Sequence, residues 1–470
     1  MKRFLLPLLL ASLTLSSSAQ NQNLVGFAYS ARPTNPTGAE WQSPEALALN
    51  KEQPRSWGFS FPTEKAATGV LPERGAYWKS LDGTWKFHWC KHPDERPKAF
   101  YEVKFDVSRW DNITVPGSWN VQGLGVEVSG APRFKYGVPI YTNQKVIFEH
   151  QVAVGDWRGG VMREPRNKQW TTYEYRHEVG SYRRTFTLPA AWNGRQVFIN
   201  FDGVDSFFYL WINGHYVGFS KNSRNTASFN ITRFLDAKAR EQVVAVEVYR
   251  NSDGSFLEAQ DMFRLPGIFR STYLTSTPEI ALSDLIVRTT ELSGSGITEE
   301  ADATLTVEAE ICNHGKKAVK GFTVEYRAYP LKLFTDELAP AATDLDSKPS
   351  AGAPAAKAVC KVAGSGALPS TRLSVHGALP WSAEAPYRYV LTATLKDARG
   401  RVVDVRSTYF GIRTVDIHET AAKDDEFGLA GRYFYVNHRP VKLRASTVTR
   451  RIRGQDMPSP TSRCSARCSS

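Results

Sequence analysis

Apolar and polar residues alternate in short runs over most of the chain, and a period of two is typical of β-strands with one buried face. Residues 305–311, for example, place Leu, Val, Ala and Ile at every second position, with Thr and Glu between them. Asn213-Gly214 follows the apolar run at 208–212 and is a strong two-residue hairpin signal, and Asp82-Gly83 predicts another hairpin within residues 80–87. Because sustained helical spacing is absent, the pattern predicts an all-β chain.

The runs fall into two groups, which predicts two consecutive sandwich domains. Many strands joined by long loops suit a jelly-roll sandwich for residues 45–280. The runs in residues 281–413 suit a smaller, immunoglobulin-like sandwich. Within it, residues 339–367 are rich in Ala, Pro, Ser and Gly and are predicted to form a long loop. Residues 414–444 contain one more strand and turn, at 434–442, and are predicted to begin a further domain.

The N-terminus has the pattern of a targeting segment. Lys2 and Arg3 precede an apolar run at 4–15, and small residues follow it. This order predicts a signal peptide at residues 1–19, with a buried N-terminal helix as the alternative. The run is too short to span a bilayer, and no later segment is long and apolar enough. We therefore expect a mature chain that starts with an N-terminal extension, residues 20–44, has no membrane span, and is periplasmic or extracellular.

The C-terminal residues 445–470 differ from the rest of the chain. They are rich in Ser and Arg, contain almost no large apolar residues, and are predicted to be disordered. The formal net charge of the chain is +12, of which Lys2 and Arg3 contribute +2 and this tail +4, leaving +6 for the body. A body charge of +6 is ordinary for the length and gives no reason to expect a nucleic-acid partner. Outside the tail, Cys90, Cys312 and Cys360 are too few for a disulfide framework, although one bridge is possible, and their spacing resembles no metal site.

Residues 251–270, NSDGSFLEAQDMFRLPGIFR, are the stretch densest in chemically distinctive side chains. The turn signals Asp253-Gly254 and Pro266-Gly267 enclose acidic, basic and apolar residues in close succession. This composition suits an ordered segment lying on another surface, or an edge loop whose charges pair locally. Glu258 and Asp261 resemble a catalytic carboxylate pair in composition. An irregular backbone fixes no distance between them, so we do not predict a catalytic role for this pair.

Several other blocks occur in a fixed order around this segment. They are SLDGTWKF from Ser80, ITVPGSWNVQG from Ile113, YGVPIYTN from Tyr136, GSYRRTFTLP from Gly180, FDGVDSFFYLWINGHYVGFSKNSR from Phe201, LPWSAEAPYRYVLT from Leu379 and FGIRTVDI from Phe410. With residues 251–270, they make residues 40–444 resemble the N-terminal portion of glycoside hydrolase family 2 β-galactosidases. The β-glucuronidases and β-mannosidases of the same family match residues 251–270 less well.

The resemblance implies a jelly roll, an immunoglobulin-like domain and then a (β/α)₈ barrel that carries the two glutamates of a retaining glycosidase. It also implies β-galactoside substrates, homo-oligomers, and the ions Mg²⁺ and Na⁺. In the family, the asparagine of the YTN block, here Asn143, reaches into the galactose site. An aspartate that contacts galactose and sodium falls at Asn222, where a neutral amide is a weaker cation ligand than a carboxylate. Ala259 likewise replaces an acid, so this chain itself shows no cofactor site.

Each of these residues also has a structural interpretation. Asn143 suits a turn or cap at the end of a strand. Trp85, Trp119 and Trp211 either stack on sugar rings or fill the core of a sandwich, which is where large aromatic side chains usually lie.

A (β/α)₈ barrel needs about 200 residues or more, and only residues 445–470 follow Arg444. We therefore expect the barrel and both catalytic glutamates to be absent from this chain. In the family, a sequence like the one that ends at Arg444 is followed by a motif beginning GVNRHE. Codons can be chosen for ASTVTRR, residues 445–451, that encode GVNRHET when the reading frame starts one base earlier. The sequence DMPSPTSR can yield HAVTHEP by the same shift of the reading frame. We hypothesise a one-base frameshift after Arg444, which requires a barrel to be encoded downstream in the other frame.

These expectations define three functional hypotheses. The first is the N-terminal, sugar-contacting and scaffold portion of an exported β-galactosidase, inactive alone. The second is a non-catalytic carbohydrate-binding protein, which would bind galactosides without hydrolysing them. The third is a structural β-sandwich subunit that complements a separate barrel and restores activity on mixing.

Overall fold

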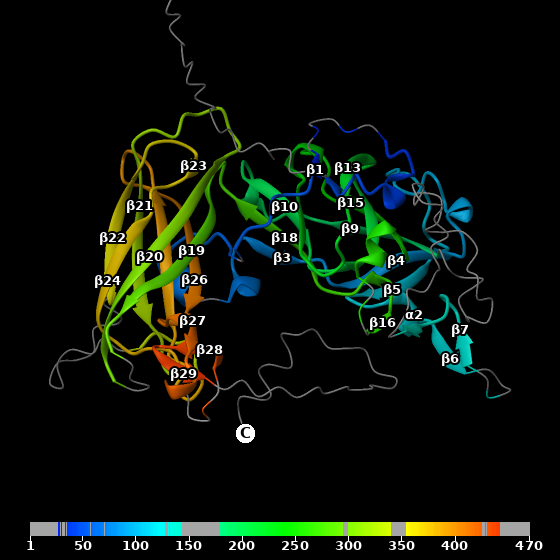
Figure 1. Ribbon diagram of the computed structural model, residues 1–470. Coiled ribbons are helices and arrows are strands. Elements are labelled where there is room, and N and C mark those ends of the chain that lie inside the picture. Colours follow the sequence, from blue (N-terminus) through cyan, green and yellow to red (C-terminus); the bar gives the residue numbers. More distant parts are fainter. Residues whose placement is uncertain are drawn as a thin grey trace, which may run out of the picture.

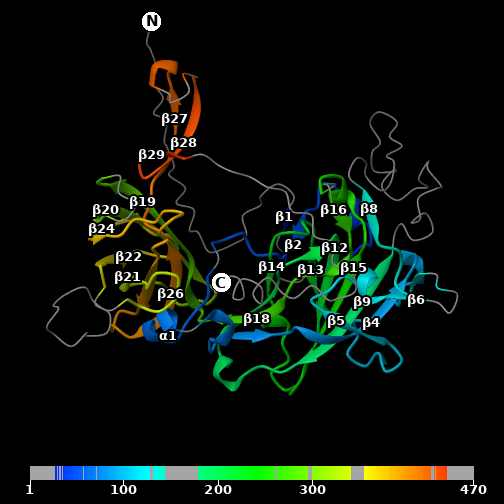
Figure 2. The same ribbon diagram turned by 90° about the horizontal axis from the view of Figure 1, so that it is seen from below.

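The alternating runs form strands throughout the computed structural model, in two β-sandwiches that lie side by side (Figures 1 and 2). The prediction of an all-β chain is therefore confirmed. None of the described helices is long and apolar enough to cross a membrane. The structure describes residues 27–28, 30, 33, 35–56, 58–69, 71–126, 130, 132–142, 178–258, 260, 262–294, 299–339, 354–424, 428 and 430–441.

The larger sandwich consists of an eight-stranded sheet, in the order β1-β2-β13-β12-β15-β9-β4-β5, and a four-stranded sheet, in the order β14-β10-β18-β3. The eight strands are, in chain order, β1 (Phe27–Ala28), β2 (Ala48–Leu49), β4 (Gly83–Cys90), β5 (Asp111–Val115), β9 (Val179–Phe186), β12 (Phe207–Ile212), β13 (His215–Ser220) and β15 (Gln242–Tyr249). The four are β3 (Trp78–Ser80), β10 (Gln196–Phe201), β14 (Ala227–Asn230) and β18 (Thr272–Thr277).

Strand β12 is buried on both faces of its sheet. Phe208, Leu210 and Ile212 belong to the core between the two sheets. Their neighbours Tyr209 and Trp211 belong to a separate, mostly aromatic cluster on the other face of the sheet. The apolar face predicted for residues 208–212 is therefore present, and the intervening aromatic residues bury the second face as well.

The three tryptophans that could either bind sugar or fill the core are all core residues. Trp85 and Trp119 are 1% and 0% exposed in the core between the sheets, and Trp211 is 2% exposed in the aromatic cluster. A ring buried to this extent has no face left for a sugar, so the core interpretation is confirmed.

The smaller sandwich pairs two four-stranded sheets. One contains β19 (Ile280–Leu292), β20 (Ala301–Asn313), β23 (Gly366–Ala367) and β24 (Thr371–Ala378), with β20 pairing the other three. The other has the order β22-β21-β25-β26 and contains β21 (Phe322–Pro330), β22 (Ala356–Val362), β25 (Tyr389–Lys396) and β26 (Val402–Phe410). Leu305, Val307, Ala309 and Ile311 of β20 all point into its core, as the alternation predicts.

Two local predictions were wrong. Asp82-Gly83 does not close a hairpin, because β3 pairs with β18 in the four-stranded sheet whereas β4 pairs with β5 and β9 in the eight-stranded sheet. Residues 339–367 are not one long loop, because residues 356–362 form β22 and pair with β21. The Asn213-Gly214 hairpin is confirmed, since β12 pairs antiparallel with β13 across it.

The smaller elements complete the described chain. A three-stranded sheet of β27 (Val415–Thr420), β28 (Gly431–Val436) and β29 (Arg439–Val441) follows the second sandwich, and β28 and β29 confirm the strand and turn predicted at 434–442. Cys90, Cys312 and Cys360 are buried and unbonded to one another. Further elements are the antiparallel pair β6 (Leu124–Val126) and β7 (Pro132–Phe134) and the helices α1 (Glu64–Gly69) and α2 (Trp119–Gln122). Short 3-10 turns are η1 (Glu40–Gln42), η2 (Pro72–Arg74), η3 (Pro93–Glu95), η6 (Ala190–Trp192), η7 (Thr232–Phe234) and η9 (Ala422–Asp424).

Candidate functional site

Residues 251–270, here called the signature segment, connect β15 to β18 and fold into three short elements. These are the 3-10 turn η8 (Asp253–Phe256), β16 (Met262–Arg264) and β17 (Gly267–Ile268). Ser252 and Ser255 cap η8 reciprocally, each side chain bonding the backbone of the other. Strand β16 pairs with β8 (Ile140–Thr142), and β17 pairs with β11 (Val204–Asp205). The described residues of the segment therefore lie on the larger sandwich, as its composition suggested.

The Pro266-Gly267 turn lets this segment approach the sandwich closely. Gly267 has φ +123°, a conformation that side chains disfavour, and a Cβ there would lie 3.0 Å from the hydroxyl of Tyr182. The carbonyl of Pro266 accepts a hydrogen bond from the backbone N–H of Trp119 at 3.2 Å. The glycine is therefore required by both its backbone conformation and its surroundings.

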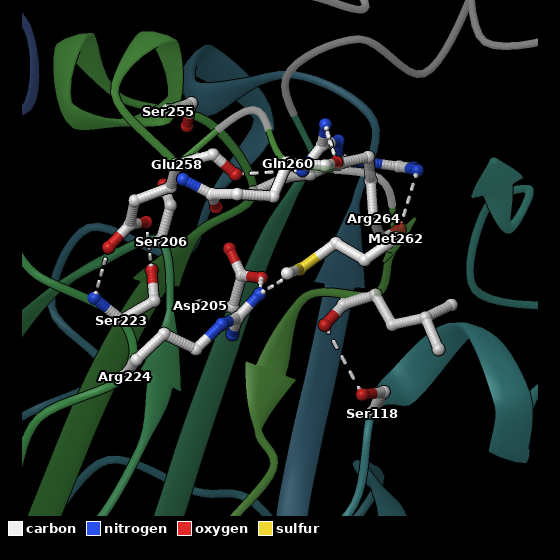
Figure 3. A network of polar contacts seen from close by, with 12 residues as sticks. Ser118, Asp205, Ser206, Ser223, Arg224, Ser255, Glu258, Gln260, Met262 and Arg264 are labelled. Carbon is white, nitrogen blue, oxygen red and sulfur yellow. Dashed lines mark hydrogen bonds and ion pairs between the residues drawn. The ribbon is translucent and has the colours of Figure 1, made fainter. Parts of the chain in front are cut away.

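A network of polar contacts fixes the signature segment to the loop at residues 221–224 (Figure 3). Glu258 accepts hydrogen bonds from the backbone N–H and the hydroxyl of Ser223, at 2.7 and 2.5 Å. Arg264 donates to the backbone carbonyls of Glu258 and Gln260, at 2.8 and 2.7 Å. The described charges Glu258 and Arg264 thus hold backbone in place through hydrogen bonds.

Asp205 and Arg224 form the second part of this network. Arg224 Nη2 lies 3.1 Å from Asp205 Oδ2 and 3.2 Å from the sulfur of Met262 in β16. Burial raises the pKa of Asp205 to about 6, and the attraction of Arg224 opposes that rise. The carboxyl is therefore held in surroundings that disfavour its charge, and Arg224 only partly compensates.

The loop at 221–224 is held from its other end by a buried ion pair. Lys221 Nζ lies 2.8 Å from Asp253 Oδ1, and the two side chains are 4% and 7% exposed. Burial lowers the pKa of Lys221 and raises the pKa of Asp253, and the pair opposes both shifts. Between Lys221 and Ser223, Asn222 is exposed and adopts φ +78°, the left-handed conformation that asparagine tolerates. Its amide therefore sits at the tip of a turn that is anchored on both sides.

The sequence-predicted site residues are only partly visible. Asn143, Ala259 and Asp261 lie outside the described residues. The sugar-contacting roles of Asn143 and Asn222 therefore stay predictions. Glu258 accepts its hydrogen bonds from Ser223, and the expectation that it is not half of a catalytic pair with Asp261 stays a prediction.

The Mg²⁺ and Na⁺ ions that the family resemblance implies stay predictions. Within the part of the chain that the structure describes, no three His, Cys, Asp or Glu side chains come together in an arrangement that could hold a metal ion. Asn222 brings a single neutral amide oxygen to the surface, whereas Mg²⁺ and Na⁺ are hard cations that favour carboxylate and carbonyl oxygens in numbers.

Asp205, Ser223 and Arg224 are central to the network, and sequence reasoning did not single them out. They occur in the FDGVDSF and KNSR blocks, but their partners lie 19 to 38 residues away. No local pattern reports such a contact. The sequence signal that could have pointed to these residues was the high density of polar residues in the FDGVDSF and KNSR blocks, which apolar strands separate.

Apolar side chains lie exposed along the signature segment and its partner strand. Tyr141 of β8 and Phe263 of β16 are 52% and 49% exposed, with ring centroids 5.2 Å apart, and Leu257 is 85% exposed. We call these three residues the apolar edge. Exposed large apolar side chains that gather in one segment are a common mark of an interaction surface.

Solved structures of glycosidases share this succession of sandwiches. The fold is similar to that of a β-glucuronidase from Bifidobacterium dentium complexed with coumarin-3-O-glucuronide, with a TM-score of 0.53 and 17% identity, covering 77% of this chain and 51% of that one. A β-glucuronidase from Bacteroides uniformis aligns with a TM-score of 0.52 and 21% identity, over 78% of this chain and 34% of that one. At these identities the likeness shows the fold alone.

Family models place the sequence more closely. Residues 78–278 match the model described as the sugar binding domain of glycosyl hydrolases family 2, and residues 286–413 match the model described as glycosyl hydrolases family 2. The chain belongs to glycoside hydrolase family 2. The two matched ranges fall on the larger and the smaller sandwich, and the signature segment lies in the first.

Curated relatives carry β-galactosidase names. The β-galactosidase of Priestia megaterium is 33% identical over 379 residues, 80% of this chain and 32% of the relative. That of Psychromonas ingrahamii is 31% identical over 382 residues, 80% of this chain and 31% of the relative. The β-galactosidase large subunit of Leuconostoc lactis is 29% identical over 349 residues, 73% of this chain and 47% of the relative. The chain thus spans between about a third and a half of the length of these relatives.

Proposed function

We propose that this chain supplies the sugar-contacting and scaffold portion of a β-galactosidase, an enzyme that hydrolyses terminal β-D-galactosides. The observation that carries this proposal is family membership together with 33% identity to a β-galactosidase over 80% of the chain. The resemblance in the signature segment points the same way, because that segment matches β-galactosidases better than other members of the family.

We propose further that the described portion is inactive alone. A retaining glycosidase needs two carboxyl groups about 5 Å apart on either side of the scissile bond. Three described acids around the signature segment have protein partners: Asp205 has Arg224, Asp253 has Lys221 and Glu258 has Ser223. They hold the fold in place, and hydrolysis in the longer relatives is expected to depend on residues outside the matched region.

Asn222 and Asn143 are the residues proposed to contact the galactoside. An amide can both donate to and accept from a sugar hydroxyl. Asn222 suits this role because its turn is fixed by a buried ion pair on one side and by Glu258 on the other. A fixed turn loses little conformational freedom when it binds, so a larger share of the contact energy appears as affinity.

The cheapest test is an activity assay on the 470-residue chain with a chromogenic β-galactoside. We expect no turnover, and measured hydrolysis would refute the claim of inactivity. Binding is tested separately by titrating a galactoside into isotopically labelled protein and following the amide resonances of residues 221–224. Asn222→Ala should abolish the response, whereas Asn225→Ala, which changes another exposed asparagine of the same loop, should keep it.

A second candidate function is that of a scaffold subunit that assembles with a separate catalytic chain. Relatives from Leuconostoc lactis and Lactobacillus helveticus are named large subunits, which implies that those proteins have a smaller partner. The apolar edge offers a surface for such a contact. Activity that appears only on mixing this chain with a separately produced catalytic portion would favour the scaffold role over the simple binding role.

We also propose that the protein is exported after removal of residues 1–19. The basic start, apolar run and small-residue site support this. N-terminal sequencing of protein recovered outside the cytoplasm should begin near Gln20. A chain that retains Met1 and stays in the cytoplasm would contradict the proposal.

A further inference from the structure

The connection between β2 and β3 of the larger sandwich does not stay on that sandwich. It leaves at Asn50, reaches the second sandwich, and returns at β3, as the blue chain between the sandwiches in Figure 1 shows. We call the described residues 50–56 and 58–69 the clasp. Neither of the matched family ranges includes the clasp, because the first begins at residue 78.

The clasp starts from a fixed point on the larger sandwich. Asn50 has φ +57° and its amide donates to the backbone carbonyl of Val217 at 2.6 Å. The backbone N–H of Glu52 donates to the carbonyl of Ser228 in β14 at 2.8 Å. These bonds direct the chain away from β2 and toward the second sandwich.

The middle of the clasp is tied to strands β19 and β20. Arg55 Nη1 lies 2.9 Å from Glu310 Oε2 in β20. The backbone N–H of Ser56 donates to Asp284 at 3.1 Å, and its hydroxyl donates to the carbonyl of Leu285 at 3.0 Å. Residues of the clasp therefore form hydrogen bonds and an ion pair with β19 and β20 at one edge of the second sandwich, where these groups would otherwise contact water.

The clasp next adds a short pairing to the outer strand of the other sheet. Phe61 forms an antiparallel bridge with Val405 of β26, with its N–H 2.8 Å from the Val405 carbonyl. Phe61, Ala67 and Val405 are 3%, 1% and 0% exposed and form a small core of their own. The ring of Phe59 contacts Tyr273 of β18, so the same few residues touch both sandwiches.

Helix α1 ends the clasp, and it packs against β25 and β26 (Figure 2). The carboxylate of Glu64 gathers three donors from the second sandwich. Arg327 lies 2.7 Å from Oε2, while the hydroxyls of Tyr329 and Thr392 donate to Oε1 at 3.0 and 2.7 Å. Donors to a charged acceptor make the stronger hydrogen bonds in proteins, so one residue provides most of the polar attachment at this end.

We propose that the clasp couples the two sandwiches into one cooperative folding unit, with Glu64 as the positioning residue that attaches it to the second sandwich. The proposal is independent of the sugar site, since none of the clasp residues belongs to the network around the signature segment. The clasp would then control the conformation of the chain, because breaking the contacts of the Glu64 carboxylate would let the second sandwich unfold without the first.

The test is hydrogen–deuterium exchange on the full chain, in water and in low urea, followed by mass spectrometry of peptides from β12 and β25. In the wild type, both peptides should exchange through the same opening, with the same dependence on urea. Glu64→Gln keeps the shape of the side chain but loses the charge. It should speed exchange of β25 about tenfold to a hundredfold while leaving β12 unchanged.

Glu308→Gln is the matched control. Glu308 forms an exposed ion pair with Arg288 in the same sandwich, and its loss should change neither peptide. If Glu64→Gln does not fold, Arg55→Gln tests the same idea at the middle of the clasp. Equal acceleration of both peptides, no acceleration of either, or an effect of Glu308→Gln equal to that of Glu64→Gln would each overturn the proposal.

Discussion

Replacing Asp205 by asparagine should make the protein more stable at neutral pH. Asp205 lies at the end of β11, its side chain is 15% exposed, and it forms an ion pair with Arg224, which is 33% exposed. Burial raises the pKa of this carboxyl from 3.8 to about 6 despite Arg224. The desolvation cost of the charge thus exceeds what the ion pair returns.

The magnitude follows from the linkage between protonation and folding. A rise of about two pKa units, at about 1.4 kcal/mol each, makes ionised Asp205 cost up to about 3 kcal/mol. Because the side chain is 15% exposed, water offsets part of this cost, and we expect about 1 to 3 kcal/mol.

The pH dependence has a definite sign. Well below pH 3.8 the carboxyl is protonated in both states and contributes nothing. As the pH rises from 3.8 to about 6 the unfolded chain ionises first, so the folded state loses stability. The loss is complete well above pH 6, where the folded carboxyl is ionised too. Asp205→Asn removes this titration, and the advantage of the variant over the wild type should therefore grow mainly between about pH 4 and 6 and level off at about pH 7.

Urea denaturation of both proteins at several pH values between 4 and 8 provides the measurement. Asp94→Asn, at a side chain that is 87% exposed, should leave the free energy of unfolding unchanged and serves as the control. If Asp205→Asn is less stable than the wild type at pH 7.5, the Arg224 pair outweighs desolvation, and the reasoning from burial is refuted.

Three further predictions follow from individual contacts. Arg250→Ala should lower the free energy of unfolding, measured in urea, by about 3 to 5 kcal/mol, because it leaves the buried carboxylate of Glu178 without its ion-pair partner. The two side chains are only 1% and 0% exposed. An effect below about 1 kcal/mol would show that the pair is not needed for stability. Gly218→Ala should lower the free energy of unfolding by about 1 to 3 kcal/mol, because a Cβ there would lie 2.0 Å from a backbone oxygen of β2. Unchanged stability would mean that β2 shifts without cost to make room for the methyl group. Cys90 and Cys312 should resist alkylation in the native protein at pH 8, because burial raises their pKa values to about 12 and 11 and the reactive form is the thiolate. Rapid labelling of either cysteine would contradict this prediction.

Strand positions could be predicted where one physical cause dominates. The residues of β20 alternate because one face meets a core and the other meets water, so its buried positions follow from the sequence alone. The Asn213-Gly214 hairpin is local too, since both residues adopt positive φ and the flanking strands are adjacent in sequence. In such places the sequence contains the whole reason for the structure.

Other features depend on partners that the local sequence does not reveal. Asp82-Gly83 turns the chain as expected, but whether the next strand stays in the same sheet depends on which apolar face must be buried. Strand β22 was missed because it pairs with β21 on one side only, and Val359 in its middle is 65% exposed. The contacts of Ser223 with Glu258 join residues 35 positions apart, and no periodic pattern predicts such a distance.

Among the residues that the structure describes, the charged side chains around the signature segment contact other parts of the protein. The Lys221–Asp253 and Arg250–Glu178 pairs are almost fully buried, and apolar replacements of such pairs are often as stable or more stable. A protein that keeps buried charges at some cost in stability usually keeps them where geometry matters. The Lys221–Asp253 pair attaches the signature segment to its neighbouring loop, and Arg250 also donates to the backbone carbonyl of Arg264 at 3.5 Å. Asn222 and the apolar edge are exposed, and they are the residues that the proposed contacts with a sugar and with another part of the enzyme would use.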